Sequence, residues 1–406
     1  MLSILKSRKI LSWCFFDFGI SSYPTLILTF FYGAFYAKVI ASSPESGSSD
    51  WGFTISTASV LSFVIFSMLL IQGRKLLKIL STRIFYFFFY ILIFSTSGLF
   101  FFDKGSNAYL PLILIAISLV SFELINLFYN ISLHKVVEKQ KEGLVSNLGW
   151  AFGYLGGLIS LALILLLIHS FEKYQFLFKD MNVFLLIGPF VAIWTFLFGV
   201  FHLRNFKHIK FEIPDLLNFT KNLRKIRIYG FFISYFFFNN AVICIFAFAS
   251  MFASFLFDFS EKEILFLGIF INLFGILGCL VLGRIEDKIG SEKIVRSCVL
   301  GLLILTSILF FLESKFYFWI LSLGVGFFIG PIQASSRSVM VKKIKSNDQV
   351  SAFCIFSMFG NVSAILGPFL ISLLIETTSS IRLGVIIIPI FFLISLTPFF
   401  LRKINV

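Results

Sequence analysis

The sequence has 406 residues, a formal net charge of +14, 58% hydrophobic residues and only 13% charged residues. Its mean hydropathy is +0.97. A chain of this composition has too little polar surface to cover a water-soluble globule, which excludes soluble enzymes and soluble binding modules. Runs of roughly 20 apolar residues can cross a bilayer as helices, and twelve such runs can be marked. The sequence therefore predicts an all-α polytopic membrane protein with 12 transmembrane helices.

The first apolar run, about residues 10–39, contains Asp17 and Pro24, so we expect a kink near its middle. Five further runs complete a first half, at residues 52–72, 84–102, 109–133, 145–169 and 183–203. A basic stretch follows, and six more runs lie at residues 230–257, 264–282, 294–312, 316–340, 351–375 and 383–401. This order predicts an N-terminal six-helix bundle over 1–203, a basic cytoplasmic linker over 204–229 and a C-terminal six-helix bundle over 230–406.

The basic residues are unevenly divided between the two ends of these runs. Of the 34 Lys and Arg residues, 27 lie on the side that would hold both termini, and seven lie on the other side. The positive-inside rule predicts that the richer side is cytoplasmic. Basic loops facing anionic lipid account for the net charge without a nucleic-acid partner. We expect a multi-pass protein of a bacterial cytoplasmic (inner) membrane.

Residues 123–157 read as one membrane hairpin with a polar interior face. Glu123, Asn126 and Asn130 are spaced three and four apart, which places them on one side of a helix. The second arm carries glycines in a doubled small-xxx-small pattern, which allows two helices to approach closely in lipid. These are Gly149, Gly153 and Gly157. We expect them to pack helices.

An altered copy of this hairpin recurs 207 residues later, where Asn126 corresponds to Gln333 and Asn130 to Arg337. Two related sets of six spans are typical of transporters whose halves rock around a central site. In that architecture the first, fourth, seventh and tenth spans line the cavity. The polar residues on those spans are Asp17, Glu123, Asn126, Asn130, Asn239, Asn240, Gln333 and Arg337. They are the candidate substrate and proton pathway.

The two acids in this set, Asp17 and Glu123, are the only acids that we place inside the apolar runs. An ionised carboxylate near the bilayer midplane is costly, so Glu123 is the main candidate proton carrier. Asp17 is either a second carrier or a structural partner of Arg337 or of helix ends. Arg337 can hold a carboxylate or act as a topogenic charge, and the amides suit either a zwitterionic ligand or contacts between helices. The acidic first half and cationic second half favour a ligand with two opposite charges.

The turn between the eighth and ninth runs, residues 283–293, reads GRIEDKIGSEK. It resembles the G-x-L-A-D-R-x-G-R-K signature of the major facilitator superfamily, which implies a gating turn made of Gly283, Asp287, Lys288, Gly290 and Lys293. We expect Asp287 to cap a neighbouring helix, and Lys288 or Lys293 to pair with acids in one conformation. The matching turn after the second run, residues 71–75, has no Asp. Only the second-half copy therefore looks competent.

Several short stretches resemble the vacuole effluxer-like branch of that superfamily, which contains the fungal autophagy-related vacuolar amino-acid effluxer. They are Trp13, residues 16–17 (FD), 22–23 (SY), 128–130 (FYN), 149–157 (GWAFGYLGG), 238–239 (FN), 333–338 (QASSRS), 364–368 (AILGP) and 382–384 (RLG). The resemblance covers nearly the whole chain. It departs at Asn240, where relatives usually carry Asp. It implies efflux of small amphipathic solutes such as neutral amino acids.

The sequence holds no GxxxxGK, HExxH or Ser/His/Asp constellation and no CxxC pair, so we expect no enzyme activity, cofactor, metal site or disulfide framework. The expected function is secondary active transport by alternating access, with efflux of a small polar or zwitterionic metabolite and possible coupling to protons. The alternatives are uptake or uniport of a small solute, and a receptor or assembly platform with a transporter fold but no turnover. The expected partners are a small solute, protons and membrane lipid, and we expect a monomer.

Overall fold

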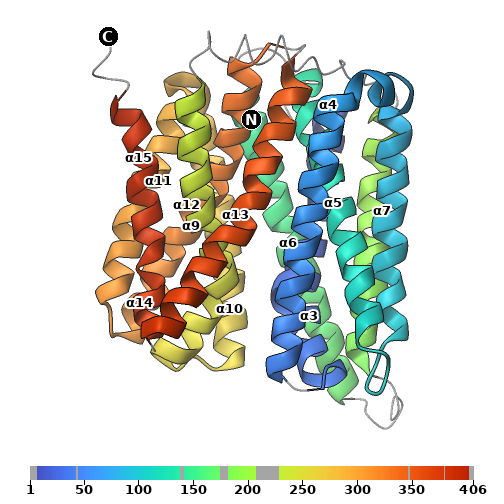
Figure 1. Cartoon of the computed structure of the whole chain (residues 1–406), viewed down its shortest axis with the longest axis vertical. Coiled ribbons are helices and arrows are strands. Elements are labelled where there is room, and N and C mark those ends of the chain that lie inside the picture. The colour runs from blue at the N-terminus through green and yellow to red at the C-terminus, as the bar shows by residue number, and fades with distance from the viewer. Residues whose placement is uncertain are drawn as a thin grey trace. The chain divides into compact units, whose positions relative to one another are not determined.

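The computed structural model describes residues 7–42, 44–137, 141–173, 182–206, 228–345, 348–378 and 380–401. Throughout these ranges the regular elements are helices (Figure 1). Eleven stretches of these helices are long and apolar enough to cross a membrane, by length and composition. The predicted all-α, multi-pass membrane architecture is confirmed. Most of the expected basic linker, residues 207–227, lies outside the described residues.

The first apolar run is not one helix. It is divided into α2 (Arg8–Ile20), the π-helix η1 (Tyr23–Phe30), the short α3 (Tyr32–Phe35) and a second π-helix, η2 (Tyr36–Ile40). Pro24 stands in the first turn of η1, where its missing N–H ends the regular hydrogen-bond ladder of α2. The longest piece, α2, has 13 residues, too few to count among the eleven spans. The expected interruption of this run is therefore observed.

The second and third runs lie in one continuous helix, α4 (Pro44–Gly98), followed by η3 (Leu99–Phe101). The break expected between the two runs is absent, because all of residues 44–98 are helical. Figure 1 shows instead that the α4 ribbon turns back on itself. It contributes two candidate spans, Asp50–Ile71 and Arg83–Phe101. The backbone therefore makes the turn without leaving helical hydrogen bonding.

The remaining elements follow the predicted order. They are α5 (Tyr109–Val136), α6 (Glu142–Lys173), η4 (Val183–Leu186), α7 (Ile187–Phe206), α9 (Tyr229–Phe257), α10 (Glu261–Ile289), α11 (Ser291–Phe311), α12 (Lys315–Lys343), α13 (Gln349–Thr378), α14 (Ile381–Val385) and α15 (Ile387–Leu401). Gly290 joins α10 directly to α11 with a φ of 97°, in the region that favours glycine. That single residue allows the sharp reversal between the two helices.

The chain forms two compact units. Unit 1 holds Met1–Ser62, Leu80–Tyr129 and Phe152–Lys210, and unit 2 holds Phe63–Ile79, Asn130–Ala151 and Phe211–Val406. In unit 1, α2 packs on α7; in unit 2, α12 packs on α10 and α11 while α9 packs on α13 and α15. The end of the hairpin made by α5 and α6 thus belongs to unit 2. The division of the chain into two six-helix halves stays a prediction.

Within unit 1, glycines of α6 allow close contact with the first run. A Cβ added to Gly156 would lie 2.0 Å from the carbonyl oxygen of Phe18, so only glycine fits there without a backbone shift. Among the three glycines that the sequence singled out, Gly153 faces Asp17 and Gly157 faces Thr25. The third, Gly149, is buried in α6. The period-four pattern did not include Gly156, which makes the tightest of these contacts.

An ion pair between Lys315 and Glu263 lies at the connection between α9 and α10. The ammonium of Lys315 lies 2.8 Å from the Glu263 carboxylate and 3.0 Å from the carbonyl oxygen of Asp258, above the ring of Phe259. Glu263 also forms a capping box with Ser260 at the start of α10. Hydrogen bonding to Lys315, and then to Ser260, lowers the pKa of Glu263 to about 2. Glu263, which lies outside the apolar spans, is therefore kept ionised by its contacts with Lys315 and Ser260.

Candidate functional site

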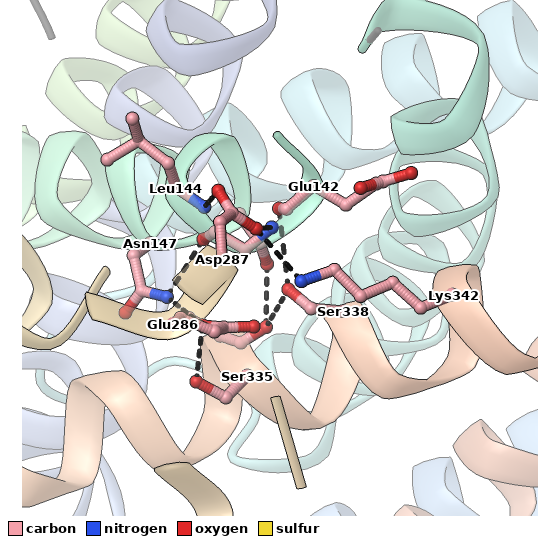
Figure 2. A network of polar contacts seen from close by, with 11 residues as sticks. Glu142, Leu144, Asn147, Glu286, Asp287, Ser335, Ser338 and Lys342 are labelled. Atoms are coloured by element: carbon pink, nitrogen blue, oxygen red, sulfur yellow. Dashed lines mark hydrogen bonds and ion pairs between the residues drawn. The ribbon is translucent and has the colours of Figure 1, made fainter. Parts of the chain in front are cut away.

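A polar network in unit 2 joins the start of α6 to α10 and α12 (Figure 2). Its centre is the Asp287 carboxylate at the end of α10. Oδ1 accepts the backbone N–H of Gly143 at 2.9 Å, and Oδ2 accepts that of Leu144 at 3.0 Å. These N–H groups belong to the first turn of α6 and have no acceptor within their own helix. Asp287 therefore caps α6 from another helix, and Lys342 of α12 binds the same carboxylate at 2.9 Å.

Glu286, one residue earlier, is fully buried. Its Oε2 accepts hydrogen bonds from Asn147 Nδ2 of α6 and from Ser335 Oγ of α12, both at 2.6 Å. Asn147 also donates to the carbonyl oxygen of Gly143 at 2.9 Å. The sequence places Glu286 in the turn of residues 283–293, whereas the structure has it on a helix, within the candidate span Phe266–Ile289. Helix α10 continues to Ile289, and its last two turns pack on α6.

Two glycines make this close packing possible. A Cβ added to Gly143 would lie 2.6 Å from Glu286 Cδ and 2.7 Å from Asp287 Oδ1. A Cβ added to Gly283 would lie 2.5 Å from Asn147 Cβ. The first glycine of the gating-turn sequence therefore contacts the partner helix itself. The second, Gly290, supplies the positive φ of the turn.

Arg337 of α12 holds the same hairpin end. Its Nε donates to Ser146 Oγ at 2.9 Å and its Nη2 to the Ser146 carbonyl oxygen at 2.8 Å. Its Nη1 donates to Asn130 Oδ1 of α5 at 3.0 Å. The guanidinium is buried, with 4% of the residue exposed. The two positions that the internal repeat relates, Asn130 and Arg337, thus bind each other.

The sequence predicts that Lys288 or Lys293 pairs with acids in one conformation; in the conformation that the structure describes, other lysines pair with the acids of this region. Over the described residues, Asp287 pairs with Lys342 and Glu292 pairs with Lys343. Neither Lys288 nor Lys293 forms an ion pair in that part of the chain. The cations come from the last turn of α12, which folds back onto the α10–α11 connection.

In unit 1, Asp17 is held by two hydroxyl groups. Tyr129 Oη donates to Oδ2 at 3.1 Å, and Ser21 Oγ donates to Oδ1 at 3.2 Å. The ring of Tyr129 stacks on that of Trp13 with centroids 4.3 Å apart. Trp13 Nε1 in turn donates to the Tyr129 carbonyl oxygen at 3.3 Å. Asp17 thus belongs to a structured cluster that joins α2 to α5.

Glu123 and Asn126 differ from Asp17. Both side chains are half-buried on α5. Among the described residues, neither of the two forms a hydrogen bond or an ion pair. Asn130 lies one turn further along the same side of the helix and is bound to Arg337. The middle of α5 therefore presents a carboxyl and an amide that other side chains leave available.

Unlike Glu123 and Asn126, the amide residues of the second half form side-chain hydrogen bonds. Gln333 Nε2 donates to Asn239 Oδ1 at 3.0 Å, which links α12 to α9. Asn240 Nδ2 donates to Ser363 Oγ of α13 at 3.0 Å and to the Phe236 carbonyl oxygen at 2.8 Å. The structure thus brings Gln333 and Asn239 together. Asn240 instead bonds to α13 and to its own helix.

Sequence reasoning missed the small polar groups that complete the network. These are Ser146, Asn147, Ser335 and Ser338, together with Lys342. Ser335, Ser338 and Lys342 recur at spacings of three and four, which puts them on one side of α12. That polar stripe at the end of an apolar helix was the available signal.

Comparison with known proteins places these observations in a wider context. Residues 55–405 match the family described as "Vacuole effluxer Atg22 like". Over 401 residues the chain is 24% identical to the "Uncharacterized MFS-type transporter YxiO" of Bacillus subtilis (strain 168), covering 95% of this chain and 92% of that protein. It is 28% identical over 214 residues to "Autophagy-related protein 22" of Vanderwaltozyma polyspora. That match covers 48% of this chain and 41% of the fungal protein.

Solved structures of transporters, two of them titled as members of the major facilitator superfamily, share the fold. The transporter FucP in the outward conformation superposes with a TM-score of 0.72 at 13% identity, covering 98% of this chain and 99% of that one. A bacterial homologue of the iron transporter ferroportin, in an outward-facing state with soaked iron, gives 0.71 at 10% identity, covering 98% and 99%. The proton:xylose symporter XylE gives 0.69 at 11% identity, covering 99% and 95%. At these identities the likeness is one of fold.

Proposed function

The chain belongs to the vacuole effluxer Atg22-like family, and on that premise we propose that it exports a small polar or zwitterionic metabolite, such as an amino acid, in exchange for protons. The protein is a multi-pass transporter of the major facilitator type. Efflux is supported by the family description, which names effluxers. A bacterial inner membrane with both termini cytoplasmic is supported by the excess of basic residues on one side.

One observation carries the coupling proposal. Glu123 lies within the candidate span Tyr109–Val136, half-buried and without a hydrogen bond or ion pair among the described residues. Carboxylates inside a membrane span are costly and mark ion or proton pathways unless they are paired. Asp17, in contrast, already accepts two hydrogen bonds. Glu123 is therefore the proposed proton carrier, and Asp17 is assigned to holding α2 against α5.

The gating turn is proposed to hold one conformation of the transport cycle. In the proposed orientation, the connection between α10 and α11 lies at the cytoplasmic end of the spans. The Asp287 cap and the Arg337 clamp bind the end of the α5–α6 hairpin there. Breaking them would free that hairpin end. Glu123 and Asn126, on α5, are the proposed contacts for the proton and the ligand.

The test is solute transport by purified protein in proteoliposomes. Vesicles loaded with a mixture of amino acids and placed in a pH gradient should release a solute in a gradient-dependent way. The Glu123→Gln variant should lose the response to the pH gradient while still exchanging solute between the two sides. The Asp17→Asn variant is the matched control, because its carboxyl is already bonded. Full pH-gradient dependence in Glu123→Gln would refute the carrier assignment, and no solute movement by the parent protein would refute transport of these solutes.

A further inference from the structure

The network around Asp287 contains an acid whose hydrogen bonding is incomplete. Both donors to Glu286 bind Oε2, from Asn147 and Ser335. Oε1 is buried and has no hydrogen-bond partner in the described part of the chain. Ser291, the first residue of α11, lies beside this carboxyl. Its buried Oγ likewise has no partner among the residues described. Each of these two neighbouring oxygens therefore has a free hydrogen-bonding position, and a hydroxyl such as that of Ser291 is both a donor and an acceptor.

Among the described residues, no cation contacts this carboxyl directly. The ammonium of Lys342, on α12, is bound to Asp287. The guanidinium of Arg337, also on α12, is bound to Ser146 and Asn130. Asp287, which lies next to Glu286 on α10, adds a second negative charge nearby.

Among the residues described, no cation of α11 or α6 forms an ion pair with it either, although α11 also carries Lys293 and Arg296. On α11, Glu292 is paired with Lys343, and Cys298 carries a buried thiol. On α6, Asn147 contributes an amide, and the Glu142 side chain points away from Glu286 in Figure 2. An ionised carboxylate that is buried without a contacting cation is strongly disfavoured.

We propose that Glu286 is a proton-binding site, which holds a proton on Oε1 while the end of the α5–α6 hairpin is docked and releases it to water when that end moves away. The bound proton is donated to Ser291 Oγ, so that both unpartnered oxygens gain a hydrogen bond. Movement of α6 removes Asn147 and opens the carboxyl to solvent, where the ionised form is favoured. This site is separate from Glu123. It rests on the proposed alternating-access function, because it gives the docked end its dependence on pH.

The direction of the effect follows from proton counting. The docked form binds one proton more than the undocked form, so acid favours docking and alkali favours release. One linked proton changes the ratio of docked to undocked protein by at most tenfold per pH unit. The relevant acidity is that of the compartment next to this end of the helices. Docking is therefore expected to respond to the pH on one side of the membrane only.

The test measures docking without transport. Spin labels on the exposed positions Lys141→Cys and Lys345→Cys report the distance between the hairpin and the end of α12, in nanodiscs between pH 5.5 and 8.5, a range of about three tenfold steps. The five native cysteines are buried and stay in place. The population at short distance should grow as the pH falls, with a slope of up to tenfold per unit. In the Glu286→Gln variant, the end of the α5–α6 hairpin should stay docked at every pH.

Two variants keep the test decisive. Ser291→Ala should move the transition to lower pH without changing its slope, because it removes the acceptor of the bound proton. Asp287→Asn should weaken docking at every pH and keep the slope. The proposal is overturned if the parent shows no slope, if Glu286→Gln keeps it, or if Asp287→Asn abolishes it. It is also overturned if sodium chloride shifts docking at constant pH more than choline chloride does, since a metal cation would then occupy the site.

The control Glu123→Gln should keep the slope. A failure of the parent protein to transport would count against the proposed function alone, since these distances are measured without substrate.

Discussion

Replacing Asp287 by Ala should release the end of the α5–α6 hairpin from α10. The carboxylate caps two N–H groups of α6, at Gly143 and Leu144, and pairs with Lys342. Loss of an N-terminal cap costs about 0.5–2 kcal/mol, the charge at a helix N-terminus adds about 0.3–1 kcal/mol, and a partly exposed ion pair adds about 0–1 kcal/mol. The docked form should therefore lose about 0.8–4 kcal/mol, or roughly 4- to 700-fold in its population ratio.

Hydrogen exchange read by mass spectrometry, with the protein in nanodiscs, measures this change. The informative amides are those of residues 146–151, which bond within α6 and are shielded while the end is docked. The amides of Gly143 and Leu144 lose their acceptor in the variant itself, so they report nothing about docking. Exchange at 146–151 should accelerate in Asp287→Ala by up to the population factor. Lys342→Gln, which removes only the ion pair, should accelerate it by about fivefold at most.

The reasoning would be refuted by either of two results. Unchanged exchange at residues 146–151 in Asp287→Ala would mean that the cap contributes no docking energy. An equal acceleration in Lys342→Gln would mean that the ion pair, and not the cap, holds the hairpin. Normal exchange in α7 of both variants confirms that each is folded.

Two further predictions concern stability. Gly156→Ala should lower the unfolding free energy by about 1–3 kcal/mol, because its Cβ would overlap the Phe18 carbonyl oxygen; Gly52→Ala, where the added Cβ meets nothing within 4 Å, is the control. The pKa of Glu263 is lowered to about 2 by Lys315, so its contribution to stability is present above the unfolded pKa and is lost as the pH falls through about 2. Thermal melting of Lys315→Met should therefore show a smaller loss of stability between pH 5 and pH 2 than the parent, and an identical loss in both would contradict the assignment.

Local sequence patterns were enough to predict the helical spans. Each span is a long apolar run, and in a bilayer a helix is the way for such a run to satisfy its own backbone. The interruption of the first run was predictable from Pro24, because a proline removes an N–H wherever it stands. The continuous α4 was not predictable, since the polar residues between its two spans suggested a loop.

The candidate site was only partly predictable. The capping role of Asp287 follows from a short pattern of glycines and charges. In the structure, Asp287 of α10 accepts hydrogen bonds from the first turn of α6. The sequence pattern did not predict which cation pairs with Asp287. Lys288 and Lys293 are its neighbours in sequence, whereas Lys342 reaches it from a different helix. Glu286 stands beside Asp287 in the chain, and only the packing of α6 and α12 makes it a buried acid.

The sequence by itself determined that this protein is a helical membrane transporter, because hydropathy, charge distribution and a recurring hairpin are properties of the chain read in order. Tertiary structure decided which polar groups meet. Asn130 and Arg337 stand 207 residues apart, and their hydrogen bond exists because the end of α5 lies against α12. Asp17 acquired two donors while Glu123 acquired none among the described residues. Burial and pairing set the chemistry of an acid, and both depend on helices distant in sequence.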